Sequence, residues 1–116
     1  DAQFFWPDGP AAMIVAKALG LPFSIKARGA DIHHWTDVAG CREQIIEAAQ
    51  QASALLAVSQ AIKADIAALD VDADKICVHH TGIDRALFHV PSEPRSILRA
   101  TLPLPANGPL LVSVGA

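Results

Sequence analysis

Apolar and polar residues follow two different spacings along the chain. Apolar positions recur every three or four residues in four segments, at 8–19, at 41–52, in the stretch that begins after Ser59, and around 94–101. Shorter runs that alternate or are continuously apolar occur at 22–27, 54–58, 75–80 and 109–114. The first spacing predicts amphipathic helices and the second predicts strands.

Predicted strands and helices alternate along the chain, and the opening residues DAQFFWP resemble the middle of a further strand. Alternation at this spacing predicts a parallel sheet joined by right-handed crossovers. We therefore expect an α/β protein with a Rossmann-like parallel sheet and flanking helices. Four strands are expected in one sheet within residues 1–80, with 109–114 in a second sheet. Both ends look cut, and the loop 81–91 is where a domain boundary fits.

Capping residues and side-chain types give expectations for single positions. Asp8 is expected to cap the first helix, Gly20 to end it, and Ser59 to cap the third helix. The run 54–58 is typical of a strand that is buried on both faces. Cys77 is expected to be buried as a small apolar residue. The apolar residues at helical spacing in the first helix are Ala11, Ile14, Val15, Ala18 and Leu19.

Composition narrows the class of protein. The chain has 116 residues, of which 52% are hydrophobic and 18% charged, and its net charge is −3. This balance, without any cluster of basic residues, argues against binding to nucleic acid or to an anionic membrane. No apolar run is long enough to span a membrane. Cys41 and Cys77 lack a Cys-x-x-Cys partner, which favours a reduced, cytoplasmic protein.

The residues that follow the predicted strands form the candidate site, because ligands of an open parallel sheet bind outside the carboxyl ends of its strands. These residues are Arg28, Gly29, Asp31, Ser59, His80 and Gly115. Glycines allow a ligand to approach the backbone closely, and helix N-termini offer amide donors to phosphate or carboxylate. The same glycines are equally compatible with simple turns of the chain.

Other kinds of site are disfavoured by the spacing of the residues. His33-His34 and His79-His80 are adjacent pairs, and neighbouring strand residues point to opposite faces, so no metal site is expected. The chain lacks the Gly-x-Ser-x-Gly of serine hydrolases and the Gly-x-Gly-x-x-Gly of dinucleotide-binding domains.

One long segment carries a family resemblance. The sequence LLAVSQAIKADIAALDVDADKICVHHTGIDRALF, residues 55–88, contains Val58-Ser59, then Lys63, then Gly82-Ile83-Asp84 followed by Phe88. In this order these residues resemble the retaining glycosyltransferases of family 4, which have the GT-B fold. FFWPDGPAA resembles that family's helix entry, ARGADIH its loop after the next strand, and PLLVSVGA the first strand of its C-terminal domain.

The resemblance implies a division into three parts. Residues 1–80 would be part of the N-terminal, acceptor-side Rossmann-like domain, 81–93 the interdomain hinge, and 94–116 the start of a truncated nucleotide-sugar-binding domain. Gly82 and Asp84 would act in the hinge, with Gly82 at a positive φ and Asp84 accepting hydrogen bonds from the turn amides that follow it. Gly115 would belong to the donor-side loop.

The resemblance also implies an activity, which is sugar transfer from a nucleotide-diphosphate sugar to a sugar or lipid-linked acceptor. No cofactor and no metal ion would be needed, and the partner would be the remaining C-terminal domain. Such an enzyme would be cytoplasmic, with at most peripheral contact with the inner membrane. Arg28, Gly29, Asp31, Ser59 and His80 would line the cleft, while the catalytic residues stay unassigned and this piece alone would be inactive.

Two positions depart from the family pattern. His80-Thr81 stand where the family has Pro-Asn, and Arg28-Gly29 where it often has a His-Gly pair implicated in transfer. Arg28 keeps a fixed positive charge at that place. Two rival interpretations stay open, namely a non-catalytic α/β binding or scaffold fragment, and a nucleotide-dependent oxidoreductase or epimerase.

Overall fold

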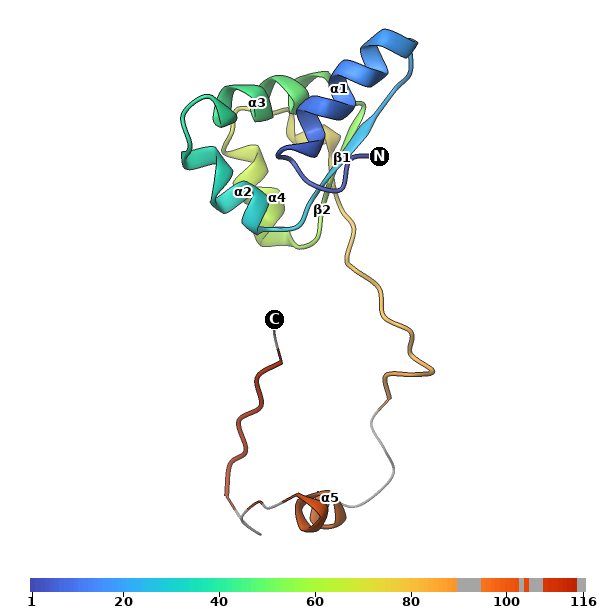
Figure 1. Ribbon diagram of the computed structural model, residues 1–116, viewed down its shortest axis with the longest axis vertical. Coiled ribbons are helices and arrows are strands. Elements are labelled where there is room, and N and C mark those ends of the chain that lie inside the picture. Colours follow the sequence, from blue (N-terminus) through green and yellow to red (C-terminus); the bar gives the residue numbers. More distant parts are fainter. Residues whose placement is uncertain (90–94, 103, 105–107, 115–116) are drawn as a thin grey trace. The chain divides into compact units, whose positions relative to one another are not determined.

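The computed structural model describes residues 1–89, 95–102, 104 and 108–114. The chain divides into two units, Asp1–Gly82 and Ile83–Ala116 (Figure 1). The first unit is an α/β unit with a small open parallel sheet and flanking helices, which agrees with a Rossmann-like fragment. The predicted α/β class is therefore correct.

The sheet of the first unit has three parallel strands in the order β1-β2-β3. These are β1 (Ser24–Ala27), β2 (Ala54–Ala57) and β3 (Ile76–Val78). Ile25 lies opposite Leu55, which lies opposite Ile76. The predicted fourth strand at the N-terminus is reduced to one parallel bridge between Ala2 and Ile25. The Ala2 N–H donates to the Ser24 carbonyl at 2.8 Å, and the Lys26 N–H to the Ala2 carbonyl at 2.9 Å.

The helices of this unit are α1 (Asp8–Leu19), α2 (Ala30–His33), α3 (Cys41–Gln51) and α4 (Gln60–Ala67). Ser59 caps α4 as predicted, since its hydroxyl accepts from the Ile62 N–H at 3.2 Å. Gly20 ends α1 with a left-handed φ of 64°, also as predicted. The prediction for Asp8 is wrong, because Pro7 occupies the N-cap without any side-chain cap and Asp8 lies in the first turn.

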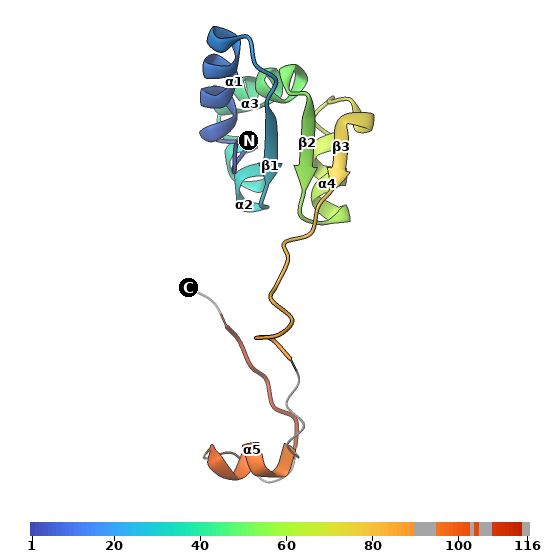
Figure 2. The ribbon, with the colours of Figure 1, turned by 90° about the vertical axis from the view of Figure 1, so that its right-hand side faces the viewer.

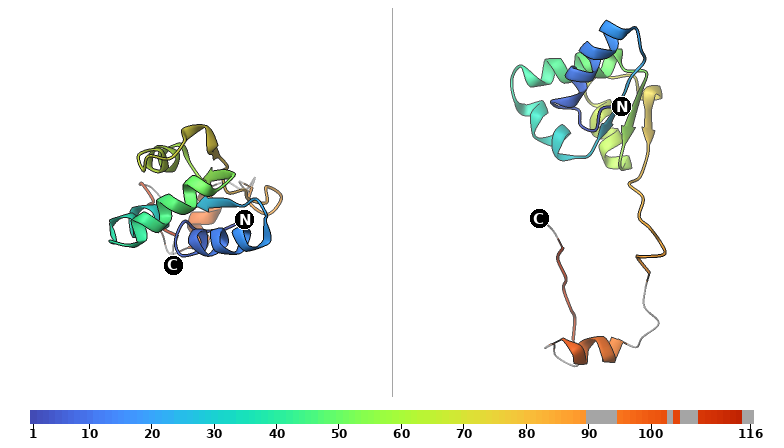
Figure 3. Two further views of the ribbon diagram at one scale, coloured as in Figure 1. Left: turned by 90° about the horizontal axis from the view of Figure 1, so that it is seen from above. Right: turned by 45° about the vertical axis from the view of Figure 1, so that its right-hand side comes forward.

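The helices lie over one face of the sheet. Because the strands follow one another in chain order, right-handed crossovers carry α3 and α4 across the same face. Figure 2 shows the three strands in front of α3 and α4, and Figure 3 gives two further views of this arrangement. The helix-covered face carries the core, with Ile25, Leu55 and Ile76 at 2% exposure or less.

The opposite face of the sheet has no helix over it within residues 1–82, all of which the structure describes. Lys26, Leu56 and Cys77 form one row across this face. Leu56 is only half-buried, so the prediction that 54–58 is buried on both faces is wrong. Cys77 is exposed, against its predicted burial, because it points to this uncovered face.

Helix α1 packs through Gly9, Pro10 and Ala16, with Met13 partly buried, and leaves three large apolar residues exposed. Gly9 and Ala16 are buried, whereas Ile14 and Leu19 are each 65% exposed and Val15 is 57% exposed. Gly9 allows the close approach, since a Cβ there would lie 3.2 Å from Cδ1 of Ile25. The apolar stripe of the sequence is therefore the outer face of this helix.

The second unit contains α5 (Arg95–Thr101), close to the helix predicted around 94–101. Residues 109–114 are described without strand pairing, so the predicted strand is not formed. Leu111 and Val114 are 96% and 95% exposed, because this apolar run has no strand beside it in the part of the chain that the structure describes.

Candidate functional site

The carboxyl ends of the strands bring several predicted site residues to one edge. Ala27 lies opposite Ala57, which lies opposite Val78, so the residues that follow these positions share the same edge of the sheet. Arg28, Ser59 and His80 are the side chains concerned. The Ala2 bridge extends this edge by a further position and adds Gln3 and Phe4 to it.

Asp31 is buried, with 3% exposure, and its carboxylate is occupied by the backbone. One oxygen, Oδ1, accepts from the N–H groups of Arg28 at 2.9 Å and Gly29 at 2.8 Å. The other oxygen, Oδ2, accepts from the Phe5 N–H at 2.8 Å. Asp31 therefore holds the loop after β1 and ties it to the N-terminal segment, and these bonds do not include the Arg28 guanidinium.

Gly29 gives this loop its shape. Its φ of 122° and ψ of −70° lie in a region that essentially only glycine adopts. A Cβ at this position would be 3.7 Å from Cδ1 of Ile62, which is ordinary contact, so the need for glycine comes from the backbone rather than from crowding.

Arg28 is exposed and is held by two residues that the sequence did not identify. Its Nη2 donates to Oε1 of Gln3 at 2.5 Å, and its guanidinium carbon lies 5.9 Å from the centre of the Phe4 ring. Phe4 is itself 41% exposed. The sequence signal for Gln3 and Phe4 is the strand-like character of DAQFFWP. In the structure these two residues follow the Ala2 bridge, as Arg28 follows β1.

Ser59 and His80 lie at the same edge, and both are hydrogen-bonded within the chain. The Ser59 hydroxyl is engaged in capping α4. Nδ1 of His80 lies 3.0 Å from the Val58 carbonyl oxygen. A carbonyl can only accept, so Nδ1 carries the hydrogen and Nε2 of the exposed ring remains available.

The two hinge residues behave differently. The prediction of a positive φ at Gly82 is wrong, and an added Cβ there would meet no atom within 4 Å. The prediction for Asp84 is confirmed, since its Oδ1 accepts from the Ala86 N–H at 2.8 Å. Whether these residues act in a hinge stays a prediction. Gly115 lies outside the described residues.

A second polar pair lies on the uncovered sheet face. Nζ of Lys26 is 3.1 Å from Nδ1 of His79, a contact that spans β2. An ammonium group has donors only, so His79 Nδ1 accepts and the proton of its neutral ring is on Nε2. The pair thus fixes one tautomer of His79.

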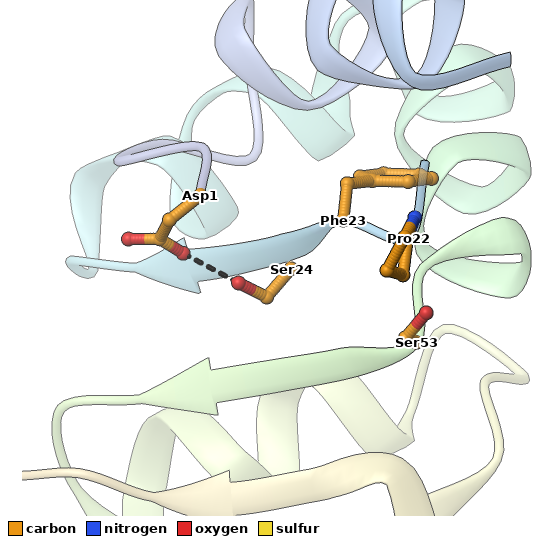
Figure 4. A pocket seen from close by; sticks show the side chains of 5 residues that line it. All are labelled: Asp1, Pro22, Phe23, Ser24 and Ser53. Atoms are coloured by element: carbon orange, nitrogen blue, oxygen red, sulfur yellow. Dashed lines mark hydrogen bonds between the residues drawn. The ribbon is translucent and has the colours of Figure 1, made fainter. Parts of the chain in front are cut away.

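A pocket of about 250 Å³ lies at the other end of the sheet from the predicted edge. It is lined by Asp1, Pro22, Phe23, Ser24 and Ser53, which precede or begin β1 and β2 (Figure 4). The Ser24 hydroxyl donates to Oδ1 of Asp1 at 2.8 Å across its wall. These residues lie at the amino ends of the strands, and Asp1 links the pocket to Gln3 of the candidate edge by a hydrogen bond.

Neither a metal-binding cluster nor a membrane-spanning helix is found among the described residues. Among them, no group of three His, Cys, Asp or Glu side chains is arranged to hold a metal ion. None of the helices found in the described part of the chain is both long and apolar enough to cross a membrane.

Comparison with models of known protein families gives no match, and comparison with curated proteins gives none either.

Proposed function

We propose that this chain is the acceptor-side part of a retaining glycosyltransferase of the GT-B type, which transfers sugar from a nucleotide-diphosphate sugar. The observation that supports it best is the position of Arg28, Ser59 and His80 at the carboxyl edge of one parallel sheet. The resemblance of residues 55–88 to family 4 is the reason for assigning sugar transfer to this edge. The enzyme would be cytoplasmic, with at most peripheral contact with a membrane.

Arg28 is the residue that we propose contributes most to transfer. Its guanidinium would bind and orient the acceptor at the carboxyl edge of the sheet, on the acceptor side of the cleft, and so hold it in place for transfer. Asp31 would act as a positioning residue, since it fixes the backbone of Arg28 and Gly29 without using the guanidinium. The donor would be held by the C-terminal domain, and no metal ion or further cofactor is proposed.

The experiment is to express the chain within its full reading frame and to supply a panel of nucleotide-diphosphate sugars with candidate acceptors. Release of the nucleoside diphosphate should depend on the acceptor. Arg28→Ala should lower the rate tenfold or more, while the matched change Arg42→Ala, at an exposed arginine of α3, should leave it unchanged. A near-normal rate in Arg28→Ala would remove Arg28 from the mechanism, and no turnover with any donor would contradict the proposal.

A non-catalytic α/β binding or scaffold unit is the second candidate. It is favoured by the internal hydrogen bonds of Asp31, Ser59 and His80, which give each of these residues a structural role without any substrate. The sequence that follows Ala116 distinguishes the two. A glycine-rich loop and a Glu-x7-Glu motif favour the transferase, and their absence favours the scaffold.

A further inference from the structure

We propose that Arg28, Gln3 and Phe4 form a binding site for an oxyanion group, a carboxylate or a phosphate, carried by the acceptor. The inference rests on the proposed function only where it assigns the anion to an acceptor. The site itself is argued from the geometry of these three side chains.

The Arg28 guanidinium is held in place by groups that do not neutralise it. The neutral amide oxygen of Gln3, Oε1, accepts a hydrogen bond from Nη2 at 2.5 Å. The centre of the Phe4 ring lies 5.9 Å from the guanidinium carbon. The orientation of the Gln3 amide is itself fixed, because its Nε2 donates to the Asp1 carboxylate. The guanidinium is thus oriented by a hydrogen bond and a ring contact rather than by an opposite charge.

The charge of Arg28 has no counter-ion in the described part of the chain. Within residues 1–89, the ion pair that is found joins His33 and Asp65, and Arg28 forms none with a carboxylate of these residues. Asp31, three residues along, is the natural candidate, but its oxygens are taken by three backbone N–H groups. An exposed and oriented guanidinium without a direct ion pair is suited to an anion from outside the chain.

The geometry favours a planar or tetrahedral oxyanion. A guanidinium carries five N–H donors in one plane, and one of them is used by Gln3. Two donors at its edge can bind two oxygens of a carboxylate or phosphate in parallel. The exposed Phe4 ring beside it offers an apolar surface for the ring of a sugar, so an acidic sugar or a phosphorylated acceptor would meet both groups.

The test is an NMR titration of the isotope-labelled 116-residue chain at constant ionic strength. Inorganic phosphate, D-glucuronate and neutral D-glucose are the probes, and the signals followed are the Arg28 side-chain N–H, the Phe4 ring and the Gly29 amide. Phosphate or glucuronate should shift these signals saturably, and glucose should not. Saturation by phosphate alone indicates a phosphorylated acceptor, and saturation by glucuronate alone indicates a uronic acid.

Three variants make the assignment specific. Arg28→Gln should weaken anion binding at least tenfold. Gln3→Glu should do the same with the guanidinium still present, because it supplies the missing counter-charge; an unchanged backbone amide spectrum elsewhere shows that the fold is kept. Arg42→Gln is the matched control on α3 and should bind as the parent does.

The inference is overturned if neither anion saturates, if glucose shifts the same signals, or if Arg42→Gln weakens binding as much as Arg28→Gln. Its failure differs from failure of the proposed function. If anions bind at Arg28 but the full reading frame transfers no sugar, the proposed transferase is contradicted and the anion site stands. If sugar is transferred but no anion binds, the anion site is contradicted and the proposed transferase stands.

Discussion

Asp31 is a buried residue whose removal should strongly lower the stability of the first unit. Its carboxylate accepts from three backbone N–H groups, those of Phe5, Arg28 and Gly29, at 2.8 to 2.9 Å. One of these donors is 26 residues away, so the carboxylate joins the N-terminal segment to the loop after β1. In Asp31→Ala all three donors would lose their acceptor, and the Phe5 contact is buried.

The magnitude follows from the kind of bond. A hydrogen bond to a charged group contributes about 1.5–3 kcal/mol, and a buried donor left unsatisfied costs about 1–3 kcal/mol. Two of the three bonds are only partly buried and count for less. We expect Asp31→Ala to lower the free energy of unfolding by about 3–5 kcal/mol, out of a total of about 5–15 kcal/mol for a typical domain.

Asp31→Asn tests the same point with less change in shape. Its amide oxygen can replace Oδ1 and accept from Arg28 and Gly29, but its NH₂ would face the Phe5 N–H, donor to donor. The expected loss is about 1–3 kcal/mol. Asp65→Asn is the control, because Asp65 pairs with His33 on the surface at 2.9 Å and should contribute at most about 1 kcal/mol.

The assay is urea unfolding followed by the fluorescence of Trp6 and Trp35, the two tryptophans of the chain, whose rings lie 6.3 Å apart. The order of stability should be parent, Asp65→Asn, Asp31→Asn, then Asp31→Ala. If the free energy of unfolding of Asp31→Ala lies within about 1 kcal/mol of the parent value, the carboxylate does not hold this loop. The backbone N–H groups of the loop would then be satisfied by water.

Three further predictions concern single positions. Gly29→Ala should lower the free energy of unfolding by about 1–3 kcal/mol in the same assay, because alanine is strained at the positive φ of this position. Gly82→Ala should change it by no more than about 0.5 kcal/mol. Equal losses in the two variants would contradict the positive φ at Gly29. Cys77 should react with a thiol reagent in the folded chain faster than the half-buried Cys41, and the reverse order would show that the sheet face is covered. The neutral ring of His79 should carry its proton on Nε2 in long-range nitrogen NMR spectra, and an Nδ1-protonated ring would exclude its contact with the lysine ammonium.

Local signals in the sequence predicted the elements whose determinants are local. Ser59 and Gly20 work through backbone groups within four residues, so a sequence pattern is enough to find them. The role of Asp31 could not be found in this way. A carboxylate after a strand indicates a ligand as readily as a structural bond, and its partner Phe5 is brought to it only by the tertiary fold.

The candidate edge was predicted for β1 to β3 but missed at its fourth position. Gln3 and Phe4 belong to it because Ala2 adds one bridge beside β1. The strand-like character of DAQFFWP predicts the strand but does not show which of its side chains contact Arg28. The exposed sheet face was missed for a related reason. An apolar run such as 54–58 indicates side chains that are stable when buried. Whether a helix covers them depends on the order of the strands and on the handedness of the crossovers.

Helix α1 shows why the largest apolar stripe need not be the packed one. Periodicity identifies the stripe of Ile14, Val15 and Leu19, but the distance between a helix and the sheet below it is set by the side chains between them. Gly9 and Ala16 let α1 lie close enough for Ile25 to pack against its backbone, with only 3.2 Å available where a Cβ would be. The small residues of α1 therefore set its distance from the sheet, and the stripe of larger apolar residues is left on the outer face of the helix.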